Sequence, residues 1–240
     1  MSTSELPDPP WIQARKPRSG RGAPLSRDAI VEAALRVVDR EGLEATSMRR
    51  VAEELGTAQS ALYWHVRNKQ QLLQLVLDRV VGEIELPPRD PENWQAELKA
   101  LAREMRRVLT SHGDIARVTI GAIPAGPNIL VVVEWMHALL REAGLPDRTV
   151  ALFGDLAGLY VGAYAFEESL GLASPTGEDL PPEEVLAMLG EYWASLPQDR
   201  FPHTLALGDL LFEGGPDERF EFGLDVLIRG LESLPAEAAS

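Results

Sequence analysis

The side chains best suited to specific chemistry lie in one short segment, residues 46–66, which reads TSMRRVAEELGTAQSALYWHV. Gln59 can form paired hydrogen bonds with the edge of an adenine, and Arg49 and Arg50 can reach a guanine edge or a phosphate. Further hydrogen-bonding side chains follow at Ser60, Tyr63, His65 and Lys69. This combination predicts contacts to bases at one point of the segment and contacts to the phosphate backbone beside it.

Two short helices must position these side chains, because apolar residues recur at helical spacing on both sides of a glycine. We expect one helix from Ser47 to Leu55, stopped by Gly56, and a second over residues 59–65. Small or apolar residues stand where the two helices would cross, at Ala52, Leu55, Ala61 and Leu62. A helix-turn-helix inserts the start of its second helix into the major groove, where Gln59 would lie. An ordinary helical hairpin with exposed polar residues fits the same pattern, and this alternative stays open here.

Catalytic and metal-binding patterns are not found elsewhere in the sequence. The chain has no cysteine, which excludes disulfides and thiolate ligands. His112, His137 and His203 are far apart and lack the spacing of zinc ligands. There is no Ser–His–Asp order, phosphate-binding loop or dinucleotide-binding glycine motif. We therefore expect no catalytic residue, no metal and no cofactor, so that a helical enzyme is disfavoured.

The charge is distributed unevenly along the chain. The formal net charge is −14, which on its own disfavours binding to DNA. Residues 1–82, however, carry 12 Lys and Arg against 10 Asp and Glu, whereas the remainder carries 11 against 27. A mildly basic beginning on a strongly acidic body is typical of a small DNA-binding domain joined to a larger domain that does not touch DNA.

Three regions are expected along the chain. Residues 1–25 are rich in proline and glycine and are predicted to be a disordered basic arm, which can either reach DNA or remain a solvated tail. A helix-turn-helix domain is expected over residues 26–86, with a helix from Ser26 to Gly42 before the motif and one from Asn68 after it. A larger domain is expected over residues 87–240.

Helical periodicity also runs through the larger domain. The expected helices are 92–111, 114–121, 127–143, 147–171, 183–195 and 216–233. An acidic loop is expected at 172–182, an irregular stretch at 197–204, and a short turn at 204–212. No segment alternates with the period of a strand, so the predicted fold class is all-α.

Residues 25–85 resemble the DNA-binding domain of the TetR (tetracycline-repressor) family. The resemblance is carried by Gly42-Leu43, Arg49-Arg50-Val51-Ala52, Leu55-Gly56 and above all LYWHVRNKQQLL at 62–73, a form close to the tetracycline repressor subgroup. It implies DNA contacts by Ser47, Arg49, Gln59, Ser60, Ala61, Tyr63, His65 and Lys69. Ser60 and Ala61 stand where that subgroup has a proline and a threonine, so a different operator sequence is expected.

A fainter resemblance continues to about residue 172, most clearly in LTSHGDIARVTIG at 109–121. It implies that the larger domain binds a ligand among its helices and dimerises through the helices at 147–171 and 216–233. The residues that form the magnesium–tetracycline site of the subgroup are not present at the corresponding positions of this sequence. The metal-binding histidine of that site corresponds to Thr119, and two further polar anchors correspond to apolar residues near Leu86 and near Leu101 or Ala102. A less polar effector is expected, with candidate contacts at Trp94, Leu101, Met105, Thr119, Trp135, Leu139, Phe153, Tyr160 and Tyr164.

These observations predict a ligand-responsive transcriptional regulator, most simply a repressor. It would bind a palindromic double-stranded DNA operator as a homodimer and be released by a small, largely apolar effector. A helical protein-interaction module, or an activator without a small-molecule effector, is the alternative. The first ten residues lack the apolar core of a signal peptide, and the most apolar run, Ile129–Val133, is too short to cross a bilayer. We therefore expect a cytoplasmic location and no membrane partner.

Overall fold

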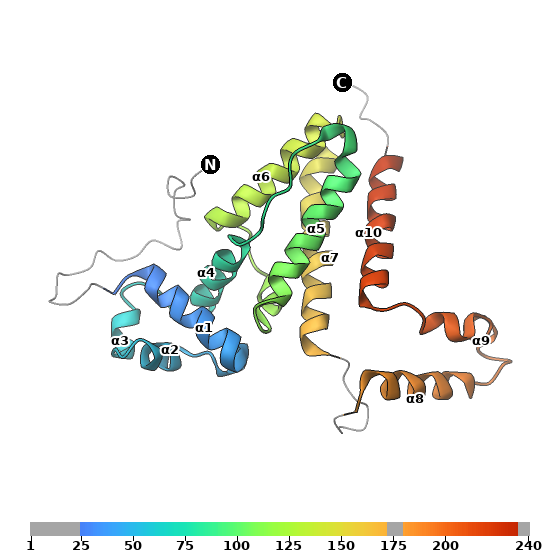
Figure 1. The fold of residues 1–240 in the computed structure, drawn as a ribbon, viewed down its shortest axis with the longest axis horizontal. Helices are drawn as coiled ribbons and strands as arrows, with labels where there is room; N and C mark the ends of the chain where they lie inside the picture. Colours follow the sequence, from blue (N-terminus) through green and yellow to red (C-terminus); the bar gives the residue numbers. More distant parts are fainter. Residues whose placement is uncertain (1–24, 172–179, 235–240) are drawn as a thin grey trace. The chain divides into compact units, whose positions relative to one another are not determined.

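The computed structural model describes residues 25–171 and 180–234, and within these ranges every regular element is a helix (Figure 1). The predicted all-α fold class is confirmed. The chain divides into two compact units, Met1–Ser169 together with Ser233–Ser240, and Leu170–Glu232. Residues 1–24 of the predicted basic arm and residues 172–179 of the predicted acidic loop lie outside the described residues.

The first four helices form a small bundle that we call the head. They are α1 (Arg27–Ala45), α2 (Met48–Glu54), α3 (Gln59–Leu62) and α4 (Lys69–Val81). The side chains of Ser26, Ser47 and Asn68 cap α1, α2 and α4 by accepting a backbone N–H of the first turn. Gly42 breaks α1 with a φ of 80° and a ψ of 169°, a conformation that glycine adopts without strain. The predicted stop at Gly42 is thus a break, after which one helical turn continues to Ala45.

One apolar core holds the head together and extends beyond it. Ile30, Val38, Val51, Leu62 and Val76 are all almost completely buried within it. The same core includes Val108 and Ile115 from the part of the chain that follows the head. Burial of apolar surface is the main force that holds helices of this length in place. The head therefore packs on the next helices of its unit rather than standing apart from them.

The rest of the first unit is built around α4. It comprises η2 (Pro91–Asn93), α5 (Trp94–Thr110), η3 (Ile115–Thr119), α6 (Pro127–Glu142) and α7 (Asp147–Leu170). Helix α4 contacts α1 in the head and also α5, η3 and α6 outside it. A displacement of α5, η3 or α6 can therefore reach the head through α4.

A single carboxylate fixes α4 to the beginning of α6. Asp78 Oδ1 accepts the backbone N–H groups of Asn128 and Ile129, both at 3.1 Å. The side-chain amide of Asn128 donates back to the Asp78 carbonyl oxygen at 3.0 Å. Gly126 permits this approach, because a Cβ at that position would collide with the Asp78 carboxylate. Asp78 thus caps α6 from another helix and satisfies amides that have no partner within α6.

The second unit contains α8 (Pro182–Ala194), α9 (Pro202–Leu207), η4 (Gly208–Leu211) and nearly all of α10 (Pro216–Ser233). The ring of Trp193 meets that of Phe212 edge-on, with centroids 5.4 Å apart. The guanidinium of Arg219 donates to the carbonyl oxygens of Leu211, Glu213 and Gly214. These contacts fix the turn between η4 and α10.

Two sequence-based boundaries are wrong. The stretch 197–204 was expected to be irregular, but α9 begins inside it at Pro202, the first helical position, where a missing N–H costs nothing. The second motif helix was expected to reach residue 65, but α3 ends at Leu62 and residues 63–65 form a turn. That turn still leads directly into the cap at Asn68, so the order of elements is as predicted.

Helix α7 is the one described helix that is long and apolar enough to cross a membrane by length and composition. In the sequence the run Ile129–Val133 is the most apolar, and this criterion does not single out α7. In α7 the apolar residues are interspersed with small ones over 24 positions, so they form no long uninterrupted run. Val161 and Ala165 are buried, whereas Leu152, Leu156 and Leu159 are exposed along another face. Helices that pack inside a protein or against a second protein pass the same test of composition.

Candidate nucleic-acid interface and effector site

The turn between α2 and α3 brings the predicted DNA-reading residues to the surface. Gly56 has a φ of 62°, which a glycine adopts at no steric cost. The N–H of Thr57 donates to the carbonyl oxygen of Ala52 at 2.9 Å, which closes the end of α2. The buried side chains Ala52 and Leu62 then anchor the two helices to the core of the head. The expected helix-turn-helix geometry is present.

The first turn of α3 is open to solvent. Gln59 and Ser60 are exposed and Ala61 is half-buried, while Leu62 faces the core. Tyr63 and Trp64 are also exposed, which is unusual for rings of this size in the absence of a partner. The Gln59 amide nitrogen donates to the Tyr63 hydroxyl at 3.1 Å, so this pair is oriented before any contact with DNA.

Arg49 and Arg50 are neighbours in sequence but differ in surroundings. Arg49 has 82% of its side chain exposed and contacts Glu53 on the same helix face. Arg50 donates to both oxygens of Glu41, at 2.9 and 2.7 Å, and also to Glu54. Arg40 contacts the same two glutamates and so completes a network between α1 and α2. Arg50 is therefore engaged in the fold, whereas Arg49 is accessible to a nucleic acid.

This network has a clear electrostatic consequence. Hydrogen bonds from Arg50 and then Arg40 lower the pKa of Glu41 to about 2. The hydrogen bond from Arg40 is the largest of the effects that lower the pKa of Glu54. The network therefore stays ionised throughout the neutral range and holds the beginning of α2 against α1.

The remaining predicted DNA contacts lie at the start of α2, after α3 and at the start of α4. The Ser47 hydroxyl oxygen accepts the N–H of Arg50 as the cap of α2. His65 is half-buried in the turn after α3. Lys69 is also half-buried, and its Nζ donates to the carbonyl oxygen of Leu43 at 2.8 Å. The lysine thus closes the end of α1, a role that the sequence pattern did not indicate.

The predicted effector contacts are spread over four elements of the first unit. Buried apolar side chains from α5, α6 and α7 belong to this set, namely Trp94, Leu101, Trp135, Leu139 and Phe153. Met105 of α5 is half-buried. The Trp135 indole N–H donates to the carbonyl oxygen of Pro87 at 3.1 Å, so its polar atom is satisfied.

Thr119 and two tyrosines complete the predicted effector contacts. Thr119 ends η3, and its hydroxyl donates to the Ala116 carbonyl oxygen at 2.6 Å. Gly162 of α7 passes so close that a Cβ there would collide with Thr119. Tyr160 and Tyr164 lie one turn apart on α7, with ring centroids 4.9 Å apart. Thr119 therefore sits where η3 meets α7, and a small side chain fits there.

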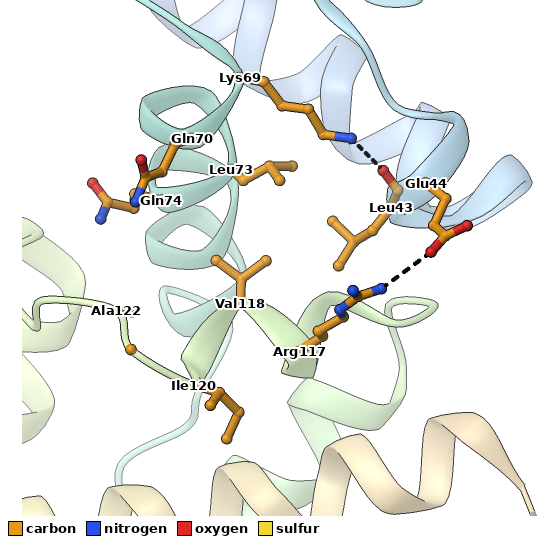
Figure 2. Close-up of a pocket in the computed structure, with 11 residues that line it drawn as sticks. Leu43, Glu44, Lys69, Gln70, Leu73, Gln74, Arg117, Val118, Ile120 and Ala122 are labelled. Carbon is orange, nitrogen blue, oxygen red and sulfur yellow. Dashed lines mark hydrogen bonds and ion pairs between the residues drawn. The ribbon is translucent and has the colours of Figure 1, made fainter.

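A groove of about 580 Å³ lies elsewhere, between the head and η3 (Figure 2). Its walls include Leu43, Leu73, Val118 and Ile120, none of which was among the predicted effector contacts. Lys69 reaches across one end to Leu43, and Arg117 contacts Glu44 at 3.4 Å, as the dashed lines in Figure 2 mark. Sequence periodicity could assign these residues to helix faces but could not indicate that the faces leave a groove.

Comparison with known proteins identifies both halves of the chain. The family described as "Bacterial regulatory proteins, tetR family" matches residues 30–76, which lie within the head. The family described as "Tetracyclin repressor-like, C-terminal domain" matches residues 86–234.

Individual relatives align over most of their length. The chain is 35% identical to the HTH-type transcriptional repressor DrrR1 of Streptomyces coeruleorubidus, over 95% of this chain and 84% of that protein. It is 33% identical to the class C tetracycline repressor protein of Escherichia coli, over 88% and 92%. The crystal structure of the TetR family protein ActR of Streptomyces coelicolor in complex with actinorhodin has a TM-score of 0.80 and 41% identity, over 91% of this chain and all of that one.

Proposed function

The chain belongs to the tetR family of bacterial regulatory proteins, and on this premise we propose that it represses transcription by binding a palindromic operator as a homodimer. Members matched here are named as transcriptional regulators, which are not enzymes, so the expectation that the chain is no enzyme is confirmed. The observation that carries the proposal is the exposed start of α3, where Gln59 and Ser60 stand on a turn fixed by Gly56.

The proposed division of labour on DNA follows from exposure and from existing contacts. Gln59 would pair with a base edge in the major groove, and Arg49 would reach a base or a phosphate. Ser47, Ser60, Tyr63 and His65 would contact phosphates and sugars, and Ala61 the methyl group of a thymine. Lys69 would contribute mainly through its charge, because its ammonium group already holds Leu43.

The exposed leucines of α7 support the proposed homodimer. Leu152, Leu156 and Leu159 recur at spacings of four and three, so they line one face of the helix, and each is at least 48% exposed. A continuous apolar face on a long helix is costly in water and is typical of a surface that packs on a second copy. A two-fold dimer would present two α3 helices to two half-sites about one DNA turn apart, ~34–36 Å.

The proposed effector is a small, largely apolar molecule bound among α5, α6 and α7. The candidate contacts are Trp94, Leu101, Met105, Thr119, Trp135, Leu139, Phe153, Tyr160 and Tyr164. Most of this surface is apolar, as in ligand sites generally, and ActR has been crystallised with actinorhodin. Binding would displace η3 and α6 and, through α4, the head, which would shift the dimer away from the DNA-binding arrangement. A regulator of this kind acts where the chromosome is, in the cytoplasm.

One experiment tests the proposal as a whole. The full-length protein is used to select duplexes from a random pool, and binding to the selected duplex is then measured by fluorescence anisotropy. We expect an inverted repeat bound by a dimer, with an affinity that falls steeply as salt increases. A set of apolar antibiotics, and separately actinorhodin, is then added, and the active compounds should lower the affinity for DNA. Selection of no duplex would refute DNA binding, and tighter binding with every active compound would refute effector release.

A further inference from the structure

His112 joins three elements of the first unit through its two ring nitrogens. Its Nδ1 lies 3.0 Å from Asp39 Oδ1 on α1, and its Nε2 lies 2.9 Å from Glu83 Oε2, just beyond the end of α4. His112 itself stands in the turn between α5 and η3, and 15% of its side chain is exposed. The imidazole therefore links the first and last helices of the head to the part of the unit that follows.

Two carboxylates at the two nitrogens of one imidazole require the doubly protonated ring. A neutral imidazole has one N–H and one lone pair, so it can donate to one carboxylate but must turn its lone pair toward the other. The imidazolium donates to both and forms two charge-assisted hydrogen bonds. The geometry at His112 is therefore that of a charged histidine.

The turn that carries His112 is fitted to α1 at two further points. Asp114 Oδ1 accepts the backbone N–H of Leu43 at 2.7 Å, at the break in α1. Gly113 has a φ of 50°, and a Cβ there would lie 3.0 Å from the carbonyl oxygen of Val38. The backbone of the turn thus lies directly against α1, and the imidazole is held over Asp39.

Asp39 and Glu83 contact His112 directly, and the elements packed around it carry further charged groups, most of them paired with one another. These further groups are Glu32 on α1, Arg79 on α4, Arg107 and Glu104 on α5, and Asp114 in the turn of His112 itself. Arg79 contacts Glu83 at 2.7 Å and Glu32 at 2.6 Å, which moderates the negative charge near the ring. Burial acts to lower the pKa of His112, but the hydrogen bonds to Glu83 and Asp39 outweigh it and the pKa is raised above the ordinary 6.5.

We propose that His112 is a positioning residue that locks the head in place while its ring is protonated, so that the affinity for operator DNA falls as the pH rises. The inference rests on the proposed function, because its readout is binding to DNA. When the proton leaves, one of the two carboxylate links is lost and the head gains freedom. A dimer that binds two half-sites then loses the conformational freedom of its heads on binding, and this entropic cost lowers the affinity.

The test is the pH profile of DNA affinity for the full-length protein. Wild type and His112→Gln are titrated with the duplex selected by the wild type, from pH 6.0 to 8.5 at constant ionic strength. Glutamine can donate to a carboxylate but cannot titrate. We expect the wild-type Kd to rise several-fold over this range. The rise can reach about ten-fold for each unit by which the pKa of His112 is higher in the DNA-bound protein than in the free protein. The His112→Gln profile should lack this component.

Two controls separate this effect from other histidines. His203→Gln removes an exposed histidine of the second unit and should reproduce the wild-type profile. His65→Gln removes a proposed phosphate contact, so it should weaken binding at every pH while the component due to His112 remains. Parallel profiles for wild type and His112→Gln would overturn the proposal.

A second variant keeps the proposal testable if His112→Gln does not fold. Asp39→Asn removes one of the two carboxylates and should shift the midpoint of the affinity profile to lower pH, because the imidazolium loses a charged partner. An unchanged midpoint would also overturn the proposal. Failure to select any duplex would instead refute the proposed function, whereas a selected duplex bound without a pH component from His112 refutes this inference alone.

Discussion

Arg50 forms a bidentate contact with Glu41, at 2.9 and 2.7 Å, while its neighbour Arg49 points to solvent with 82% of its side chain exposed. The two adjacent arginines at the start of α2 therefore have different roles. The sequence suggested that either could reach DNA. The structure shows that only Arg50 contacts a second helix, because its partner Glu41 lies on α1, nine positions earlier in the sequence.

The first prediction uses this pair as a matched set. Arg50→Ala should lower the melting temperature, because it removes one of the two arginines that Glu41 and Glu54 share and loosens α2 from α1. Arg49→Ala should leave the melting temperature nearly unchanged, since an exposed pair within one helix contributes little, but should weaken binding to DNA. Differential scanning fluorimetry and anisotropy on both variants would check this. Equal melting temperatures would contradict the assignment.

The second prediction concerns stability in acid. Because Arg50 and Arg40 lower the pKa of Glu41 to about 2, its contribution to stability is fully present above the ordinary value of 4.5 and is lost as the pH falls toward 2. Glu41→Gln should therefore melt at a lower temperature near neutral pH and lose less stability between pH 4.5 and 2. Melting temperatures across this range would measure the effect. Glu167→Gln, which changes an exposed glutamate of α7, should follow the wild type.

The third prediction concerns the cap that Asp78 provides for α6. Asp78→Ala leaves the amides of Asn128 and Ile129 without their acceptor and should reduce the free energy of unfolding by about 1–3 kcal/mol. Asp78→Asn retains one acceptor oxygen and should cost less. Asp199→Ala, which removes an exposed aspartate of the second unit, serves as the control. Urea unfolding gives the comparison, and equal stability of Asp78→Ala and the wild type would refute the cap.

The fourth prediction addresses the dimer. Leu156→Glu places a charge in the exposed leucine face of α7 and should yield a folded monomer with much weaker binding to the palindrome, because the two half-sites are then bound independently. Leu130→Glu alters a similarly exposed leucine of α6 and should leave the dimer intact. Size-exclusion chromatography with light scattering measures the mass. A dimer of unchanged stability for Leu156→Glu would place the interface elsewhere.

The sequence predicted what local patterns determine. Caps at Ser26, Ser47 and Asn68 and the glycine at 56 mark helix ends through short-range chemistry, whereas Gly42 breaks α1 without ending it. The start of α9 was missed, because Pro202 favours the first position of a helix as much as a loop. The resemblance of residues 62–73 to the family indicated the function more specifically than the charge distribution or the helical periodicity did.

Contacts between distant positions could not be predicted in the same way. The links from Asp78 to Asn128 and from His112 to Asp39 join residues 50 and 73 positions apart. Nothing in their local sequence indicates a partner, since an aspartate on a helix or a histidine in a turn is usually solvated. Such links depend on how the helices pack, and they are the ones that connect the head to the rest of its unit.

The central claim is that the first turn of α3 reads an operator, and the most direct test is the base discrimination of Gln59. Wild type, Gln59→Ala and the control Gln198→Ala, which alters an exposed glutamine of the second unit, are titrated with the selected duplex and with duplexes altered at single positions. We predict that the wild type loses about 1–3 kcal/mol at one half-site position. Gln59→Ala should lose that discrimination, and Gln198→Ala should retain it. Unchanged discrimination by Gln59→Ala at every position would contradict the account.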